Sequence, residues 1–254
     1  MAKPARKTRP KKKPNQTGIA PIRLFLLFVI PFLVFAIGFI PLILWVRLIL
    51  YVITFPSLVA YALLPFIIGL ALFILLVSEV LISGAIIRLF NIRYTEGTYE
   101  YTVTNNTAFK WMLLCQLYTP MRKILEIIPM GHMQRAYLRL LGMKIGKNSL
   151  VGGVIKDPCV TEFGDNVTMG EYAIVYGHIH NYAQGTLAIK KVTTGDNCII
   201  GAGAILMPGA VMEENSVAGA GSLVTKNQVL EKNKVYGGNP AREIATVTKT
   251  KQKH

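Results

Sequence analysis

Two histidines separated by one residue, His178 and His180, are the side chains of this sequence best suited to moving a proton. They close a run of six-residue repeats, which thirteen residues (181–193) then interrupt. In a parallel coil with three repeats per turn, residue n lies beside residue n+18, and neighbouring strands are about 4.8 Å apart. Glu162 precedes His180 by eighteen residues, so we predict that its carboxylate orients His180 as a general base. His178 is the competing candidate for the base.

The repeat runs from Ile145 to Val229 and predicts the fold. The first place of each hexad is mostly apolar, the second is often glycine, and the fifth is mostly small or β-branched. Such hexads are typical of a parallel β-helix, in which stacked repeats bury a continuous core that no single repeat could bury. We therefore predict a β-helix domain over residues 145–245, with the interruption forming a loop beside the histidines.

Two long apolar segments precede the coil. Leu24–Val46 holds 23 residues without a charge, and Leu48–Ser78 holds another 31. About 20 apolar residues span a bilayer, so we predict a transmembrane helical hairpin over residues 23–90. Its turn is expected at 55–57, where a re-entrant or interfacial piece is the alternative. Lysine and arginine flank the hairpin on both sides, which favours a multi-pass protein of the cell membrane with both termini and the coil in the cytoplasm.

Residues 91–144 join the hairpin to the coil. Their pattern predicts short strands within 92–104 and three helices: one capped by Thr107, one opened by Pro120, and one over 132–141. Apolar and basic residues mix along these helices, so we expect them to lie in the membrane interface, to cap the first turn of the coil, or both.

Glu79 stands within the second apolar segment, about 13 Å of helix before Arg88. A carboxylate in the inner leaflet usually faces protein and has a role. If the span instead ends near Leu75, Glu79 lies at the surface.

Composition indicates the partners. The formal net charge is +15, and the basic tail over residues 1–22 supplies roughly half of it. This tail is predicted to be disordered, with membrane lipids rather than nucleic acid as its partner; a short basic tail over 246–254 ends the chain. The three cysteines, Cys115, Cys159 and Cys198, have no metal or redox spacing, so we expect them to be reduced, with Cys198 pointing into the coil.

These motifs resemble the hexapeptide-repeat acyltransferases, and among them the sugar O-acetyltransferases of the maltose and colanic-acid types. The resemblance covers residues 142–245 and rests on the hexads, on Val-Tyr-Gly-His-Ile-His-Asn-Tyr-Ala at 175–183, and on Gly-Asn-Pro-Ala-Arg at 238–242. Residues 96–180 also resemble the membrane-bound C-terminal part of polylysine-type peptide synthetases. This chain departs from the acyltransferase pattern at Asp157-Pro158 and Met212-Glu213, and its loop lacks a clear carboxylate.

The resemblance implies a left-handed β-helix, a homotrimer with its site in the groove between subunits, an acyl-CoA donor such as acetyl-CoA, and His180 as the catalytic base. It also implies that small residues on two turns admit the pantetheine arm and that two cations meet the CoA phosphates. These residues are Gly201, Ala202, Gly203, Ala204, Gly219, Ala220, Gly221, Ser222, Lys226 and Arg242.

We therefore expect a membrane-anchored acyltransferase that acts on a hydroxyl or amine of a lipid-linked sugar, a lipid headgroup or an envelope precursor, with no metal. One alternative is a zinc enzyme of the γ-carbonic-anhydrase type. That site needs three histidines from two subunits, and the coil contains only His178 and His180. A non-catalytic scaffold for a membrane complex is the other alternative.

Overall fold

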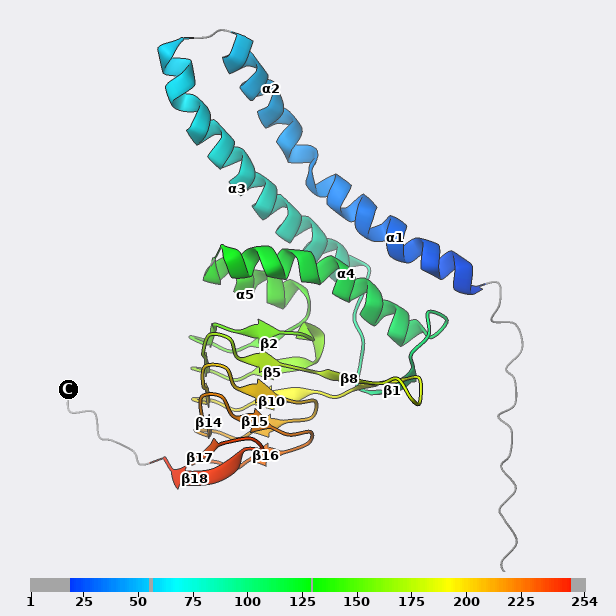
Figure 1. The fold of residues 1–254 in the computed structure, drawn as a ribbon, viewed down its shortest axis with the longest axis vertical. Coiled ribbons are helices and arrows are strands. Elements are labelled where there is room, and N and C mark those ends of the chain that lie inside the picture. The colour runs from blue at the N-terminus through cyan, green and yellow to red at the C-terminus, as the bar shows by residue number, and fades with distance from the viewer. Residues whose placement is uncertain (1–18, 55–56, 129, 248–254) are drawn as a thin grey trace, which may run out of the picture.

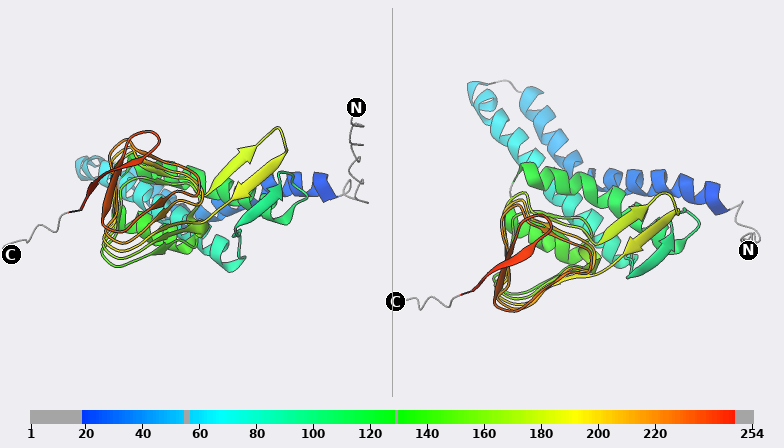
Figure 2. Two further views of the ribbon diagram at one scale, coloured as in Figure 1. Left: turned by 90° about the horizontal axis from the view of Figure 1, so that it is seen from below. Right: turned by 60° about the horizontal axis from the view of Figure 1, so that its bottom comes forward.

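The computed structural model describes residues 19–54, 57–128 and 130–247. Most of the predicted basic tails, and Phe55 and Pro56 of the predicted turn, lie outside these residues. The described chain forms a coil of short strands with a helical hairpin at one end (Figure 1). Viewed nearly along its axis, the coil is a rounded triangle (Figure 2).

Three parallel sheets make the three sides of the coil. The first contains β2 (Lys144–Ile145), β5 (Thr161–Phe163), β10 (Val192–Thr194), β13 (Val211–Met212) and β16 (Val229–Leu230). The second contains β3 (Leu150–Val151), β6 (Thr168–Met169), β11 (Ile199–Ile200), β14 (Val217–Ala218) and β17 (Lys234–Gly237), with β18 (Arg242–Thr246) antiparallel at its edge. The third contains β4 (Val154–Ile155), β7 (Ile174–Val175), β12 (Ile205–Leu206) and β15 (Leu223–Val224).

The hexads build the core as their pattern predicts. Strands stack at a spacing of eighteen residues, as where Val151 lies opposite Met169. Side chains at the first place turn inward and are almost completely buried, including Met169, Val175, Ile200 and Leu206. The fifth place holds small buried residues at the corners, among them Cys198, whose predicted inward direction is confirmed.

Asparagines at the fourth place fix one corner of the coil. Asn148, Asn166, Asn197 and Asn215 adopt φ between 54° and 58°, a left-handed conformation that asparagine tolerates better than most residues. Their side-chain amides form a ladder, with Nδ2 of Asn166 donating to Oδ1 of Asn197 at 3.2 Å. The turns are therefore stabilised both by backbone preference and by side-chain hydrogen bonds.

The interruption is a β-hairpin rather than the predicted loop. β8 (His178–Asn181) pairs antiparallel with β9 (Thr186–Ile189), and β9 pairs with β1 (Gly97–Glu100) from the segment before α4. Gly185 closes the turn at φ 61°, where glycine carries no steric cost. Figure 1 shows this hairpin leaving the coil beneath α4. It places both histidines beside the helical part of the chain.

The helical hairpin has two legs. α1 (Ile19–Gly38) and α2 (Ile40–Thr54) form one, and α3 (Leu58–Leu89) forms the other. Two stretches, Ala20–Gly38 and Tyr61–Leu89, are long and apolar enough to cross a membrane, judged by length and composition. Many of their large apolar side chains are exposed, such as Phe28 and Phe66.

Two further helices lie between the hairpin and the coil. α4 (Asn106–Ile127) continues through Pro120, so the prediction that this proline opens a separate helix is wrong. Burial of Leu117 and Met121 on either side compensates for the backbone hydrogen bond that proline cannot donate. The N-cap is Asn105, not Thr107.

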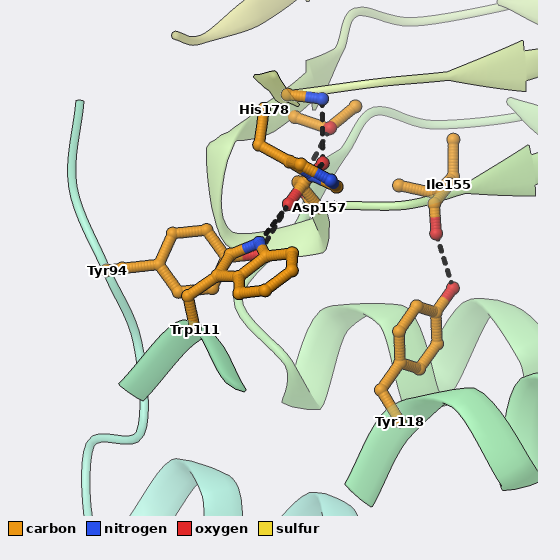
Figure 3. Close-up of polar contacts among 8 residues, drawn as sticks. Tyr94, Trp111, Tyr118, Ile155, Asp157 and His178 are labelled. Atoms are coloured by element: carbon orange, nitrogen blue, oxygen red, sulfur yellow. Dashed lines mark hydrogen bonds and ion pairs between the residues drawn. The ribbon is translucent and has the colours of Figure 1, made fainter. Parts of the chain in front are cut away.

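α5 (Gly131–Leu140) packs against β2 and β3, so it covers the first turn of the coil. The hydroxyl of Tyr118 on α4 donates to the backbone oxygen of Ile155 at 2.8 Å (Figure 3). The helices thus pack directly on the end of the coil.

Candidate active site

A buried carboxylate, Asp157, organises the region around the histidines. Its side chain is fully buried and accepts four hydrogen bonds (Figure 3). Oδ2 accepts from Nδ1 of His178 at 2.7 Å and from the backbone N–H of Gly177 at 2.8 Å. Oδ1 accepts from the hydroxyl of Tyr94 at 2.7 Å and from the indole N–H of Trp111 at 3.2 Å.

These donors keep the carboxylate charged. Burial would raise the pKa of Asp157, but the hydrogen bond and charge of His178, together with Tyr94 and Gly177, hold that pKa below its usual value. An ionised carboxylate only accepts hydrogen bonds, so Nδ1 of His178 carries the proton. The other nitrogen, Nε2, then has a free lone pair whenever the ring is neutral.

Local sequence explains why Asp157 lies there. The hexad breaks at Asp157-Pro158, and a short 3₁₀ turn, η1 (Pro158–Val160), replaces the regular corner. Gly177 permits the close approach, since an added Cβ would lie 2.8 Å from Cβ of Asp157 and 2.6 Å from a methyl of Val160.

The other two donors come from the helical part. Tyr94 follows the end of α3, and Trp111 is on α4; both are buried. The site is therefore assembled at the junction of helices and coil, where each side supplies half of the hydrogen bonds to Asp157.

His178 presents its free edge to an aromatic enclosure. Its side chain is 15% exposed, and no described residue donates to Nε2. Its ring lies edge to face with those of Trp111, at 4.8 Å between centroids, and Tyr176, at 6.2 Å. A base with an oriented ring and an open nitrogen is the arrangement that general-base catalysis requires.

His180 occupies the same enclosure without an orienting partner. Its ring stacks on Tyr182 and contacts Tyr101, Trp111 and His178 at centroid distances of 4.6–5.4 Å. Nδ1 is buried and makes no hydrogen bond with the described residues. Burial, and then the nearby His178, lower the pKa of His180, so this ring is neutral near pH 7.

The predicted contact between Glu162 and His180 is wrong. Glu162 lies opposite Thr193 in β10 and pairs at 2.7 Å with each of Lys144 and Lys191. The hairpin removes residues 178–189 from the stacked coil, so the next strand over Glu162 is β10. The carboxylate that does orient a histidine is Asp157, and it orients His178. The sequence signal for it is the break at Asp157-Pro158, where a polar residue occupies a hexad place that is usually apolar.

The residues that the resemblance assigns to CoA lie at turns and corners of the coil, where Ala204 and Ser222 are buried and the others are at least partly exposed. Gly201–Ala204 and Gly219–Ser222 form the turns after β11 and β14 and stack on each other, with the backbone N–H of Gly221 donating to the oxygen of Ala202 at 2.8 Å. Lys226 is exposed at the next corner, and Arg242 is exposed on β18. The structure brings the two small-residue turns together.

Within the three described ranges, no three side chains of the His, Cys, Asp or Glu type gather as a metal site. Of the histidines that the zinc alternative would draw on, His132 is on α5, and His254 lies outside the described residues.

The chain was compared with known proteins. No protein-family model matches it, and no curated protein matches it. Among solved structures, it is similar to a hexapeptide transferase family protein from Anaplasma phagocytophilum, with 27% identity and a TM-score of 0.34, over 42% of this chain and 57% of that one.

It is also similar to a maltose O-acetyltransferase from Clostridium difficile 630, with 26% identity and a TM-score of 0.41, over 50% of this chain and 84% of that one. A third is galactoside acetyltransferase in complex with coenzyme A, with 23% identity and a TM-score of 0.38, over 46% of this chain and 71% of that one. These structures are hexapeptide-repeat transferases and acetyltransferases. The resemblance of residues 96–180 to peptide synthetases stays a prediction.

Proposed function

We propose that this chain is a membrane-anchored acyltransferase that moves an acyl group from acyl-CoA to a hydroxyl or amine of a membrane-associated acceptor, with His178 as the general base. The observation that carries the proposal is the Asp157–His178 pair, a buried carboxylate at 2.7 Å from the imidazole that it orients. Its chemistry matches the carboxylate–histidine unit of acid–base enzymes.

The reaction follows from this pair. Nε2 of His178 takes the proton from the acceptor as its oxygen or nitrogen attacks the thioester carbonyl, and Asp157 stabilises the resulting imidazolium. The tetrahedral intermediate then collapses, its carbon–sulfur bond breaks, and His178 returns the proton to the departing CoA thiolate. Backbone N–H groups near the site would stabilise the oxyanion. His180 contributes ring surface to the enclosure around the acceptor.

Donor binding is proposed on the coil surface. The stacked turns at 201–204 and 219–222 carry only small side chains, so an extended pantetheine arm can lie against their backbone. Lys226 and Arg242 would meet the CoA phosphates. Lys190, which follows the hairpin, bonds Asn227 next to Lys226 at 2.7 Å, so this corner of the coil lies close to the base of the histidine hairpin.

The acceptor is proposed to be at the membrane, on the cytoplasmic face. α3 measures about 48 Å at 1.5 Å per residue, longer than the roughly 30 Å hydrocarbon core. Its apolar side chains are exposed over most of the length, and large exposed apolar surfaces mark contacts with lipid or protein. An anchored enzyme with a soluble donor is best explained by an acceptor that stays in the bilayer.

A homotrimer of left-handed coils is part of the proposal. The outer face of the second sheet carries Leu150 and Ile199, which are 57% and 46% exposed. These apolar side chains lie on one face of the sheet on either side of Thr168, and exposed apolar surface of this kind favours burial against a second copy of the coil.

The test is acyl transfer by the full-length protein in membranes, with radiolabelled acetyl-CoA and lipid extraction as the readout. His178→Asn is expected to lower the rate by about 10²–10⁴-fold, the usual contribution of a general base. Glu231→Gln, an exposed carboxylate at another corner of the coil, is the control and leaves the rate unchanged. Normal transfer by His178→Asn would remove the mechanism, and loss of transfer only in His180→Asn would assign the base to His180.

A further inference from the structure

A cavity in the form of a groove lies in the helical part, separate from the histidines. It has a volume of about 520 Å³ and lies between α1, α3 and α4. Its walls are apolar side chains such as Phe35 of α1, Leu72 and Leu76 of α3, and Met121 and Ile124 of α4, with Glu79 as the one charged exception among the lining residues. This volume falls within the range of small-molecule sites, which combine apolar walls with a few placed polar groups.

Glu79 is buried there without a partner. It is 5% exposed, and neither carboxyl oxygen makes a hydrogen bond with the described residues. Gly38 leaves the space that it fills, since an added Cβ at that position would lie 2.3 Å from Cδ of Glu79. The neighbouring Ser78 hydroxyl donates instead to the backbone oxygen of Gly38 at 2.8 Å. A buried polar group with no partner is costly, and native proteins rarely leave one so.

The cavity lies at the level of a membrane boundary. Glu79 is twenty-one residues after Leu58, which places it about 32 Å along α3. That distance is close to one hydrocarbon thickness, roughly 30 Å. The following part of α3 already packs on α5, where the hydroxyl of Ser83 meets that of Tyr137 at 3.1 Å. A headgroup at this level would meet Glu79, and a chain would extend into the apolar groove.

We propose that this groove binds an amphiphile, with its alkyl chain against α1, α3 and α4 and a hydroxyl or amine of its headgroup donating to the Glu79 carboxylate. Such a donor satisfies the oxygens that the protein leaves unpaired. If the proposed acyl transfer is correct, this amphiphile is the acceptor. α4 connects the two sites, because Trp111 contacts the histidines while Met121, ten residues later, lines the groove. The separation of about 15 Å along the helix suits a lipid with an extended polar head.

The experiment uses two photoreactive probes with the full-length protein in lipid nanodiscs. One is hexadecanol with a diazirine in its chain, and the other is its methyl ether, which cannot donate a hydrogen bond. Labelled peptides are identified by mass spectrometry. The wild type should be labelled in the α3 and α4 peptides that contain Leu72 and Met121, with the alcohol favoured roughly tenfold because a hydrogen bond to a charged group discriminates by about that factor.

Glu79→Leu should keep the chain labelling and lose the preference for the alcohol. Leu72→Trp should lose labelling by both probes because a larger ring on the wall fills the groove, whereas Leu44→Trp, the same change on α2 outside the groove lining, should lose neither. An unchanged preference in Glu79→Leu, or labelling that Leu72→Trp does not reduce, would overturn the proposal. His178→Asn should be labelled like the wild type, so failure of the proposed reaction and failure of this site give different results.

Discussion

Two buried carboxylates, one in each half of the molecule, are treated in opposite ways. Asp157, where the coil meets the helices, receives four hydrogen bonds from the protein. Glu79, between the helices, receives none from the described residues. The protein satisfies the hydrogen-bonding capacity of the first carboxylate, which can therefore hold its neighbour in one orientation. The hydrogen-bonding capacity of the second is satisfied only when another molecule binds. The contrast supports the two different roles proposed for them, proton transfer through His178 for Asp157 and recognition of a ligand for Glu79.

The largest effect should come from changing Asp157, the fully hydrogen-bonded carboxylate. Asp157→Asn keeps the shape of the side chain but removes the charge that fixes the proton on Nδ1 of His178. The rate of acyl transfer is expected to fall by about 10²–10⁴-fold, measured with labelled acetyl-CoA in membranes. A rate within threefold of the wild type would show that His178 needs no orienting carboxylate.

The next prediction compares stability between the halves. Glu79→Leu removes an unpaired buried group and should stabilise the protein by about 1–3 kcal/mol. Asp157→Asn should instead destabilise it, because it disrupts four donors at once. Thermal unfolding in lipid-free detergent micelles measures both. Destabilisation by Glu79→Leu would mean that the protein already satisfies this carboxyl.

A smaller change tests a single donor to Asp157. Tyr94→Phe removes one hydrogen bond and should cost about 1 kcal/mol of stability together with a few-fold loss of transfer. Tyr118→Phe is the matched control, since its hydroxyl bonds only the backbone of Ile155. It should lose similar stability and no activity. Equal activity losses in both variants would indicate a general packing effect.

The smallest effect concerns pH. The pKa of His180 is lowered in the folded state. As pH falls through the ordinary histidine value of about 6.5, the unfolded chain is therefore protonated at this residue before the folded chain is. This contribution to stability is present above that value and is lost below it. His178 and Asp157 are the titratable groups that act on His180. Replacing His180 with Phe should reduce the change of the unfolding midpoint with pH between pH 5 and pH 7. If the midpoint of the variant changes with pH as much as that of the wild type, other groups cause the pH dependence.

The regular parts of the molecule could be predicted from sequence because each repeat makes the same local choice. Apolar residues recur at the first place of most hexads, and asparagine recurs at the fourth place along one corner of the coil, so stacking at eighteen residues follows directly. The apolar segments likewise predict two long helices.

The site was harder to predict because it depends on the exception to the repeat. Counting eighteen residues back from His180 reaches Glu162, but the hairpin takes His180 out of the stack, and no local signal announces that β1 will pair with β9. The identity of the orienting group also depends on two aromatic residues, Tyr94 and Trp111, that are distant in sequence and carry no motif. Only tertiary contacts bring them to Asp157.

The pairing of β1 with β9 ties the histidine hairpin to chain that precedes α4. A fragment beginning at Gly142 would retain the whole coil and both histidines, yet it would lack the strand that holds the hairpin and two of the four donors to Asp157. The helical segment before Gly142 is thus part of the site, in addition to carrying the two long apolar stretches. Soluble versions made by trimming it should be assembled but inert, and chimaeras will work only if they carry residues 91–141 along with the coil.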